Sequence, residues 1–210
     1  MAVDVGANKG SYLFWLSRGV PAGKVVAFEP QPRLANYLKE ICIACGLANV
    51  TVHAAAVSET AGEMPLFIPG DKDSPGATLE KAMAQGEPGR SIQVPVVSLD
   101  QYFERLPGSI KALKIDVEGH ELAVFRGAER ILREHAPLLV FESEARHLSG
   151  GKVATVLNFL RERGYDGWFV CHGQLKPVAD FREEIHQPQV GDRYWDSANY
   201  CNNFIMEKRG

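Results

Sequence analysis

The first ten residues constrain the fold more than any other stretch of the chain. A short apolar run containing Asp4 is followed by Gly6 and Gly10, four residues apart. Glycine accommodates a backbone with positive φ and lets a ligand approach the main chain. A helix beginning near Ser11 would direct its unpaired N–H groups and its positive dipole end at such a ligand. This order of strand, glycine turn and helix predicts an α/β fold with a nucleotide-type cofactor site.

The acid in the first strand bears on which cofactor the turn could hold. Asp4 would repel a dinucleotide pyrophosphate, by about 4 kcal/mol for two unit charges at about 4 Å and an effective dielectric constant of about 20. It would attract the sulfonium and ammonium groups of S-adenosylmethionine (SAM). The Gly-x-x-x-Gly spacing also differs from the Gly-x-Gly-x-x-Gly of dehydrogenases. We therefore expect SAM at this turn, with an ordinary strand–turn–helix that binds no ligand as the alternative.

Apolar runs and helical patterns alternate along most of the chain. Continuous apolar runs are typical of strands buried in a parallel sheet, and with right-handed crossovers this alternation builds a doubly wound fold. We expect a mostly parallel, open sheet of seven strands with helices between them. After the first strand, the expected strands are residues 24–29, 50–57, 112–117, 138–142, 168–171 and 204–207, and the longer helices are 11–18, 32–45, 121–135 and 153–163.

One interval departs from this alternation. Residues 65–68 and 92–97 look like a pair of strands that flank residues 69–91, a segment rich in glycine, proline and charge. We expect residues 69–91 to be a mobile surface loop or lid, and a disordered insertion would have the same composition. Residues 1–210 are expected to form a single domain. No helix is seen before the first strand to cover that edge, so the chain could be a fragment of a longer gene product.

Composition excludes several classes of protein. The chain has 45% hydrophobic and 23% charged residues and a formal net charge of -3, which gives no attraction to nucleic acid or to an anionic membrane surface. Its apolar runs are too short to span a bilayer. Four cysteines in 210 residues do not form a disulfide framework and are typical of a reducing compartment. We therefore expect a cytoplasmic protein without nucleic-acid or membrane partners.

A second acid follows the second expected strand. In an open α/β sheet the ligand lies beyond the carboxyl ends of the strands, which places Glu29 beside the glycine turn. An ionised carboxylate offers two acceptor oxygens and suits both ribose hydroxyls, although an acid at that point could simply stabilise the next helix dipole. Its spacing after Gly10 would suit an NAD-dependent oxidoreductase equally well. The same sheet edge should also receive residues 55–57, 116–120 and 142–144.

The densest group of functional side chains follows the strand at 112–117. Asp116, Glu118 and His120 crowd around a turn at Gly119, and such crowding can bring pKa values towards neutrality, as a general base requires. The three are our candidates for the catalytic base, and the sequence does not choose among them. A helix start with acids in its first turn is the plain alternative. Asp116, Glu118 and Glu142 could also hold Mg²⁺ through oxygen ligands, although nothing in their spacing demands it.

Taken together, these residues resemble the FkbM family of SAM-dependent methyltransferases. The resemblance covers roughly residues 3–144, and the combination of its motifs is specific although each alone is weak. The carrying motifs are VDVGANKG (3–10), AFEP (27–30), AAVS (55–58), VSLD (97–100), LKIDVEGHE (113–121) and FRGA (125–128).

The resemblance implies a class I methyltransferase fold, Rossmann-like and doubly wound, whose final strand, here residues 204–207, is antiparallel. It implies methyl transfer, usually to a hydroxyl of a sugar or polyketide-type natural product, and it assigns the ribose-binding acid to Glu29. The residues expected to contact the cofactor are Asp4, Gly6, Ala7, Asn8, Gly10, Glu29, Pro30, Ala56, Val57 and Asp116. An NAD-dependent oxidoreductase and a non-catalytic SAM-binding α/β module are the alternatives. The identity of the acceptor and the oligomeric state are left open.

Overall fold

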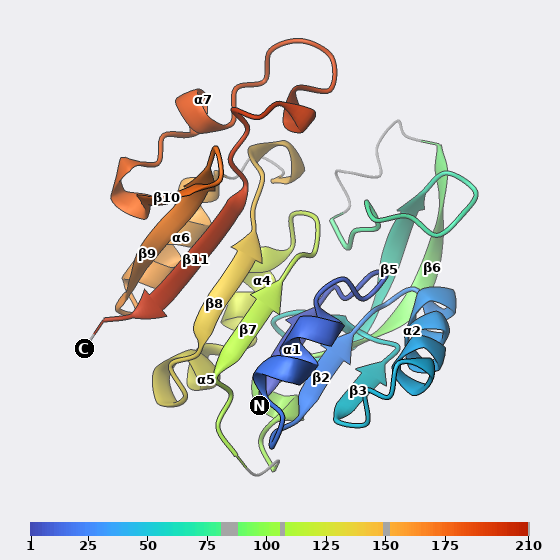
Figure 1. The fold of residues 1–210 in the computed structure, drawn as a ribbon. Coiled ribbons are helices and arrows are strands. Elements are labelled where there is room, and N and C mark those ends of the chain that lie inside the picture. Colours follow the sequence, from blue (N-terminus) through green and yellow to red (C-terminus); the bar gives the residue numbers. More distant parts are fainter. Residues whose placement is uncertain (81–87, 106–107, 149–151, 210) are drawn as a thin grey trace.

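A mostly parallel eight-stranded sheet forms the centre of the molecule (Figure 1). The computed structural model describes residues 1–80, 88–105, 108–148 and 152–209. The strand order is β10-β9-β11-β8-β7-β1-β2-β3. These strands are β1 (Ala2–Val5), β2 (Val25–Phe28), β3 (Val50–His53), β7 (Ala112–Ile115), β8 (Leu138–Glu142), β9 (Tyr165–Cys171), β10 (Gln174–Pro177) and β11 (Asn203–Lys208).

Helices cover both faces of this sheet because its central strands are apolar on both sides. In β1, Val3 and Val5 contribute to one buried cluster, whereas Ala2 contributes to another, as expected from the alternation of side chains along a strand. The cluster around Val3 includes residues of α4, α5 and α6, and the cluster around Ala2 includes residues of α1 and α2. The helices are α1 (Leu13–Gly19), α2 (Pro32–Ala44), α3 (Leu99–Tyr102), α4 (Glu121–Arg126), α5 (Glu129–Glu134), α6 (Val153–Arg161) and α7 (Glu183–His186).

The antiparallel final strand is confirmed. β11 lies between β8 and β9 and is antiparallel to both. The main sheet has one strand more than the seven expected, because β9 turns back at His172–Gly173 into β10. Both turn residues have positive φ (51° and 71°), as a two-residue hairpin turn requires. Every residue of β10 is exposed, so no hydrophobic alternation signalled this strand.

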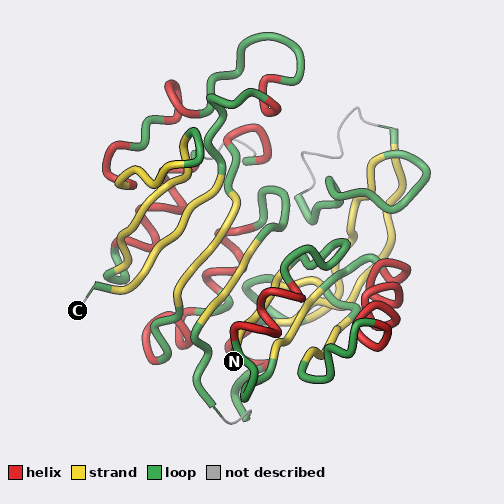
Figure 2. Tube along the Cα trace, in the orientation of Figure 1, coloured by secondary structure: helices red, strands yellow, loops and turns green. Residues whose placement is uncertain are grey.

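A second sheet of three strands explains the interval that breaks the alternation. The expected pair at 65–68 and 92–97 is the hairpin of β5 (Gly62–Pro69) and β6 (Gly89–Val97). The expected strand at 50–57 is divided, since β4 (Ala56–Val57) leaves the main sheet and pairs in parallel with β6. The loop at the tip of the hairpin is green in Figure 2, and its residues 81–87 lie outside the described part of the chain.

The expected helix at 121–135 is two helices, α4 and α5, and close packing explains the break between them. A Cβ atom added at Gly127 would lie 2.2 Å from the Ser58 carbonyl oxygen. The backbone at Gly127 is therefore in direct contact with the backbone of the segment after β4. Among the described residues, no helix has the length and apolarity needed to cross a bilayer.

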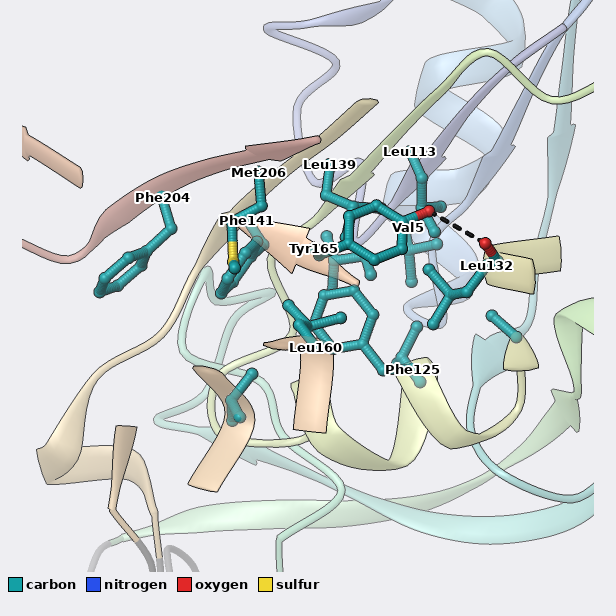
Figure 3. Packing of buried hydrophobic residues seen from close by; sticks show 14 of the residues in the cluster. Val5, Leu113, Phe125, Leu132, Leu139, Phe141, Leu160, Tyr165, Phe204 and Met206 are labelled. Carbon is teal, nitrogen blue, oxygen red and sulfur yellow. Dashed lines mark hydrogen bonds between the residues drawn. The ribbon is translucent and has the colours of Figure 1, made fainter. Parts of the chain in front are cut away.

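The core beside β8 is built from aromatic rings (Figure 3). Phe141 stacks on Phe204 with 5.3 Å between ring centroids, and its edge meets Phe125 at the same separation. Tyr165 is buried in the same cluster and donates its hydroxyl to the Leu132 carbonyl oxygen at 3.3 Å. These contacts join β8, β11 and α4 and so hold the sheet edge from which Glu142 projects.

Replacing Phe141 by alanine should therefore lower the free energy of unfolding by about 3–5 kcal/mol, because the substitution leaves a cavity beside the rings of Phe125 and Phe204. Leu138→Ala on the same strand is the matched control. Leu138 is 40% exposed, and its truncation should cost about 1 kcal/mol or less. Urea denaturation measures both variants, and equal losses would contradict this description of the core.

Candidate functional site

A pocket opens at the carboxyl ends of β1, β2 and β7. It contains about 630 Å³ of atom-free space, part of which is open to solvent. Its lining combines polar side chains that follow β1, β2 and β7 with apolar side chains from the β3–β4 region and the hairpin loop. The lining residues are Val5, Gly6, Asn8, Phe28, Glu29, Pro30, Gln31, Ala55, Ala56, Val57, Leu66, Pro75, Ala77, Leu79, Asp116, Val117, Glu118 and His120.

The glycine turn has the geometry that its sequence predicted. Gly6 has a φ of 76°, and a Cβ atom there would lie 1.8 Å from the Asp116 carbonyl oxygen. The amides of Gly6 and Ala7 both donate to the Phe28 carbonyl oxygen at 3.0 Å. The turn is therefore pressed between β2 and the segment after β7, and only glycine fits at position 6.

Glu29 lines this pocket and is 2% exposed. Its Oε2 accepts the Asn8 amide at 2.8 Å, and its Oε1 accepts the Gln31 amide at 2.9 Å. Burial raises the pKa of this carboxyl group, and the two backbone hydrogen bonds act in the opposite direction. Gln31 Nε2 also donates to Oε1, at 3.3 Å, so Oε2 keeps one lone pair with which the side chain can accept a further hydrogen bond from a ligand.

Asp4 faces a lysine rather than the pocket. Its Oδ1 lies 3.1 Å from Lys114 Nζ, which also donates to the Gly6 carbonyl oxygen at 2.8 Å. Burial raises the pKa of Asp4, whereas the lysine charge lowers it. Asp4, Ala7 and Gly10 are absent from the described lining of this pocket.

Two of the three candidate bases are already engaged. Glu118 Oε2 lies 2.7 Å from His147 Nδ1. His120 is 7% exposed and is held on both sides, with Nδ1 2.6 Å from Glu80 Oε1 and Nε2 2.8 Å from Ser58 Oγ. The turn brings these side chains together because both Glu118 and Gly119 have positive φ (52° and 96°).

Asp116 is the candidate base with the most open carboxyl group. Its side chain is 37% exposed, and its Oδ2 lies 3.7 Å from Lys114 Nζ. Burial raises its pKa, Lys114 opposes this, and the neighbouring acids Glu118, Asp4 and Glu144 add to the rise. The structure therefore leaves Asp116 accessible while the other two candidates are hydrogen-bonded elsewhere.

The loop between β5 and β6 covers the pocket, which its residues Pro75, Ala77 and Leu79 help to line. Gln31 holds it through two hydrogen bonds: its Nε2 donates to the Ser74 carbonyl oxygen, and its Oε1 accepts the Ser74 amide, both at 2.9 Å. Thr78 Oγ1 donates to the Glu118 carbonyl oxygen at 2.7 Å. Gln31 was missed at the level of the sequence, where only Pro30 was named beside Glu29. A contact across 43 residues leaves no local signal.

A second, smaller cleft lies on the other side of Asp116. It contains about 220 Å³ of atom-free space, and Asp116 lines both cavities. The cleft lies where β7 and β8 end and β11 begins, next to the start of α1. Its lining residues are Tyr12, Lys114, Ile115, Asp116, Val140, Phe141, Glu142 and Asn203.

Glu142, considered in the sequence as a possible Mg²⁺ ligand, and Glu144 form a carboxyl pair beside this cleft. Asn202 Nδ2 donates to both, at 2.9 Å to Glu142 and 2.7 Å to Glu144, and Arg146 contacts Glu144. Burial, together with the neighbouring Glu144, raises the pKa of Glu142 to about 9. Burial opposes ionisation of Glu144, but the hydrogen bonds to it outweigh this effect and hold its pKa at about 2.

Metal binding finds no support in the geometry of the site. In the described ranges, no group of three or more His, Cys, Asp or Glu side chains is arranged to hold a metal ion. The Mg²⁺ alternative at Asp116, Glu118 and Glu142 therefore gains nothing from the structure.

The parallel sheet with its antiparallel β11, the glycine turn after β1 and the acid after β2 together define a class I, Rossmann-like methyltransferase fold. The model of the FkbM methyltransferase domain matches residues 4–166, and the chain belongs to this family.

Known relatives share this fold. The chain is 29% identical over 154 residues to methyltransferase sdnD of Sordaria araneosa, and the match covers 60% of each protein. It superposes on an FkbM methyltransferase from Methylobacillus flagellatus KT with a TM-score of 0.61 at 17% identity, covering 98% of this chain and 42% of that one. SMU.1697c from Streptococcus mutans, solved in complex with SAH, gives a TM-score of 0.52 at 13% identity, with coverage of 99% and 88%. The chain thus spans 60% of sdnD and less than half of the Methylobacillus protein.

Gly6→Ala should destabilise the protein more than Gly46→Ala, because both glycines have positive φ but only Gly6 meets other atoms. The strained backbone alone should cost about 1–2 kcal/mol in Gly46→Ala, where nothing lies within 4 Å of the new Cβ. Gly6→Ala adds the collision with the Asp116 carbonyl. Chemical denaturation gives both free energies of unfolding, and equal losses would contradict the close approach.

Stability should also depend on pH through Glu121. This side chain is 1% exposed and its Oε1 accepts the Gly119 amide at 3.0 Å, and burial raises its pKa from 4.5 to about 8. Between these values the folded protein binds more protons than the unfolded chain, so this contribution to stability falls as pH rises through the window. The loss is about 1.4 kcal/mol per unit of pKa difference.

Glu121→Gln keeps the hydrogen-bond acceptor but cannot titrate. Denaturation curves between pH 4.5 and 8 should therefore be flatter for Glu121→Gln than for the unaltered protein, whereas the exposed Glu40→Gln should leave the pH dependence unchanged. Identical slopes for the unaltered protein and Glu121→Gln would show that Glu121 titrates normally.

Proposed function

We propose that this chain binds SAM in the larger pocket and transfers its methyl group to a hydroxyl oxygen of a small-molecule acceptor, a sugar or a polyketide-type compound. One observation carries the proposal: a buried carboxylate with an unused lone pair on Oε2, Glu29, lines a pocket that begins at the glycine turn of an FkbM domain. The acceptor class follows the family resemblance.

The residues present fit this cofactor. Glu29 Oε2 can accept a ribose hydroxyl, and the apolar lining residues Phe28, Val57 and Leu79 suit an adenine ring. Asn8 also lines the pocket, and its Oδ1 is buried without a hydrogen-bond partner in the described structure. A buried oxygen of this kind is costly unless a ligand satisfies it, and an ammonium group would do so.

When bound, SAM supplies an activated methyl group on a positively charged sulfur, which is a good leaving group. The task of the protein is then alignment, which can supply roughly 7–11 kcal/mol of the barrier. Asp116 lies between the two cavities, where its carboxylate can accept the proton of an incoming hydroxyl. Lys114 favours the ionised form of this carboxylate against the effect of burial, and Asp4 is paired with Lys114.

Binding is tested by calorimetry with SAM. The unaltered chain should release heat and show a thermal shift. Glu29→Ala should weaken binding by at least about tenfold, since hydrogen bonds to a charged group contribute about 1.5–3 kcal/mol. The exposed Glu40→Ala on α2 is the control. No heat at millimolar SAM would end the proposal, and stabilisation by NADH alone would favour the oxidoreductase.

The choice of base is tested by turnover, measured as SAH formation over a panel of sugar and polyketide-type alcohols. Asp116→Asn should reduce the rate about 10²–10⁴-fold, the usual contribution of a general base, while leaving SAM affinity nearly unchanged. Glu118→Gln and His120→Asn should cost less. A greater loss in either would move the base to that residue, and SAM binding without any methylated acceptor would favour the non-catalytic module.

A further inference from the structure

The first part of the loop between β5 and β6, residues 70–77, restricts the space in the larger pocket. Pro75 and Ala77 of this segment line the pocket. The pocket contains about 630 Å³ of atom-free space, but the cavity that solvent can fill is only about 80 Å³. Sites for small-molecule ligands usually have a volume of about 300–1,000 Å³. With the loop in this position the cavity is too small for a cofactor that contains a nucleoside, so the loop must move to admit one.

The residues that follow this segment are firmly attached to the protein. Thr78 exchanges two backbone hydrogen bonds with Phe67 of β5, both at 2.9 Å. Leu79 is 8% exposed and packs in the apolar cluster of the three-stranded sheet. Glu80 Oε1 lies 2.6 Å from His120 Nδ1. This end of the loop is therefore fixed, and a movement of residues 70–77 would pivot on it.

The tip of the loop has weaker connections. Ser74 exchanges two hydrogen bonds with the Gln31 side chain, both at 2.9 Å. Asp73 Oδ2 lies 3.6 Å from Arg33 Nε of α2, but the Arg33 side chain is 81% exposed, and an exposed ion pair contributes little. The other partner of Asp73, Arg90, belongs to β6 and so to the same hairpin. Within the described part of the chain, the Gln31 side chain is therefore the main connection between the tip and the rest of the pocket.

Gln31 also supports the acid that lines the pocket. Its backbone amide and its Nε2 both donate to Glu29 Oε1, at 2.9 and 3.3 Å. The same Nε2 donates to the Ser74 carbonyl oxygen, so one side-chain amide connects Glu29 with the loop. Gln31 and Glu29 are only 3% and 2% exposed. A ligand that contacts both Glu29 and the loop would favour the attached tip, because a ligand shifts an equilibrium towards the state that binds it better.

We propose that residues 70–77 form a flap that opens when Ser74 is released from Gln31, with the pairing of Thr78 and Phe67 as its hinge. Gln31 is then a positioning residue that couples closure of the flap to occupancy of the pocket beside Glu29. The inference rests on the proposed function, in which SAM is bound in this pocket. The contacts between Gln31 and Ser74 must break before SAH can leave, so their strength sets how fast the pocket exchanges its ligand.

Thiol labelling tests the flap without any ligand. Val57 lines the pocket and is 2% exposed, so Val57→Cys places a reporter thiol there, in a chain that also carries Cys45→Ser to remove the exposed native cysteine. Labelling of the reporter by methyl methanethiosulfonate should become about tenfold faster when Gln31→Met is added, because two neutral hydrogen bonds are lost. The matched control is Gln93→Met, at an exposed position of β6, which should leave the rate unchanged.

A buried native cysteine separates opening of the flap from a general loosening of the fold. Cys171 of β9 is 5% exposed, and mass spectrometry measures its labelling in the same sample. Gln31→Met should leave Cys171 protected. Equal acceleration at Cys171, or equal reporter rates for Gln31→Met and Gln93→Met, would overturn the proposal. A reporter that reacts as fast as free cysteine before Gln31 is changed would also overturn it, because the flap would then not be closed.

SAH tests the coupling. SAH should slow labelling of the reporter. In surface plasmon resonance on the chain with Val57 intact, Gln31→Met should raise the dissociation rate constant of SAH about tenfold without lowering its association rate constant. SAH that binds but leaves the labelling rate unchanged, or that dissociates equally fast from Gln31→Met and Gln93→Met, would overturn the inference. Failure of SAH to bind the unaltered chain would instead count against the proposed function, whereas labelling without ligand would still report on the flap.

Discussion

A single ammonium group connects the acids on which the site depends. Lys114 lies opposite Asp4 in the parallel register of β1 and β7, and it contacts Asp4, Asp116 and the Gly6 carbonyl oxygen. A buried charge is costly unless it is paired and hydrogen-bonded. The glycine turn, the first strand and the segment after β7 must therefore keep one register for this lysine to be satisfied, and that register sets the positions of both cavities.

Much of this arrangement could be predicted from local sequence patterns. The apolar runs indicated the central strands, and the glycine turn and Glu29 indicated where a ligand would lie. The patterns failed where structure depends on distant contacts. β10 has no buried residue, the helix break at Gly127 depends on the Ser58 backbone, and Asn202 reaches carboxyl groups some 60 residues earlier in the chain. Burial and long-range hydrogen bonds of this kind leave no periodicity to detect.

The position of Asp4 illustrates the same limit. Its acidity suggested a direct attraction for a cationic cofactor, but a strand residue next to a buried lysine is paired before any ligand arrives. Asp116, one of three equivalent candidates in the sequence, is distinguished only by the structure. Glu118 and His120 are bound to His147, Glu80 and Ser58, and Asp116 alone of the three lines both cavities.

The loop between β5 and β6, which covers the pocket, is attached to Gln31 in a way that affects how its sequence can change during evolution. Two hydrogen bonds join the Gln31 side chain to the main chain of Ser74, and these main-chain groups are present whatever residue other than proline occupies that position. The side chains of this loop can therefore differ between relatives while its hydrogen bonds to Gln31 are kept. Substitutions in this loop could therefore change which molecules enter the pocket while Glu29 keeps its position.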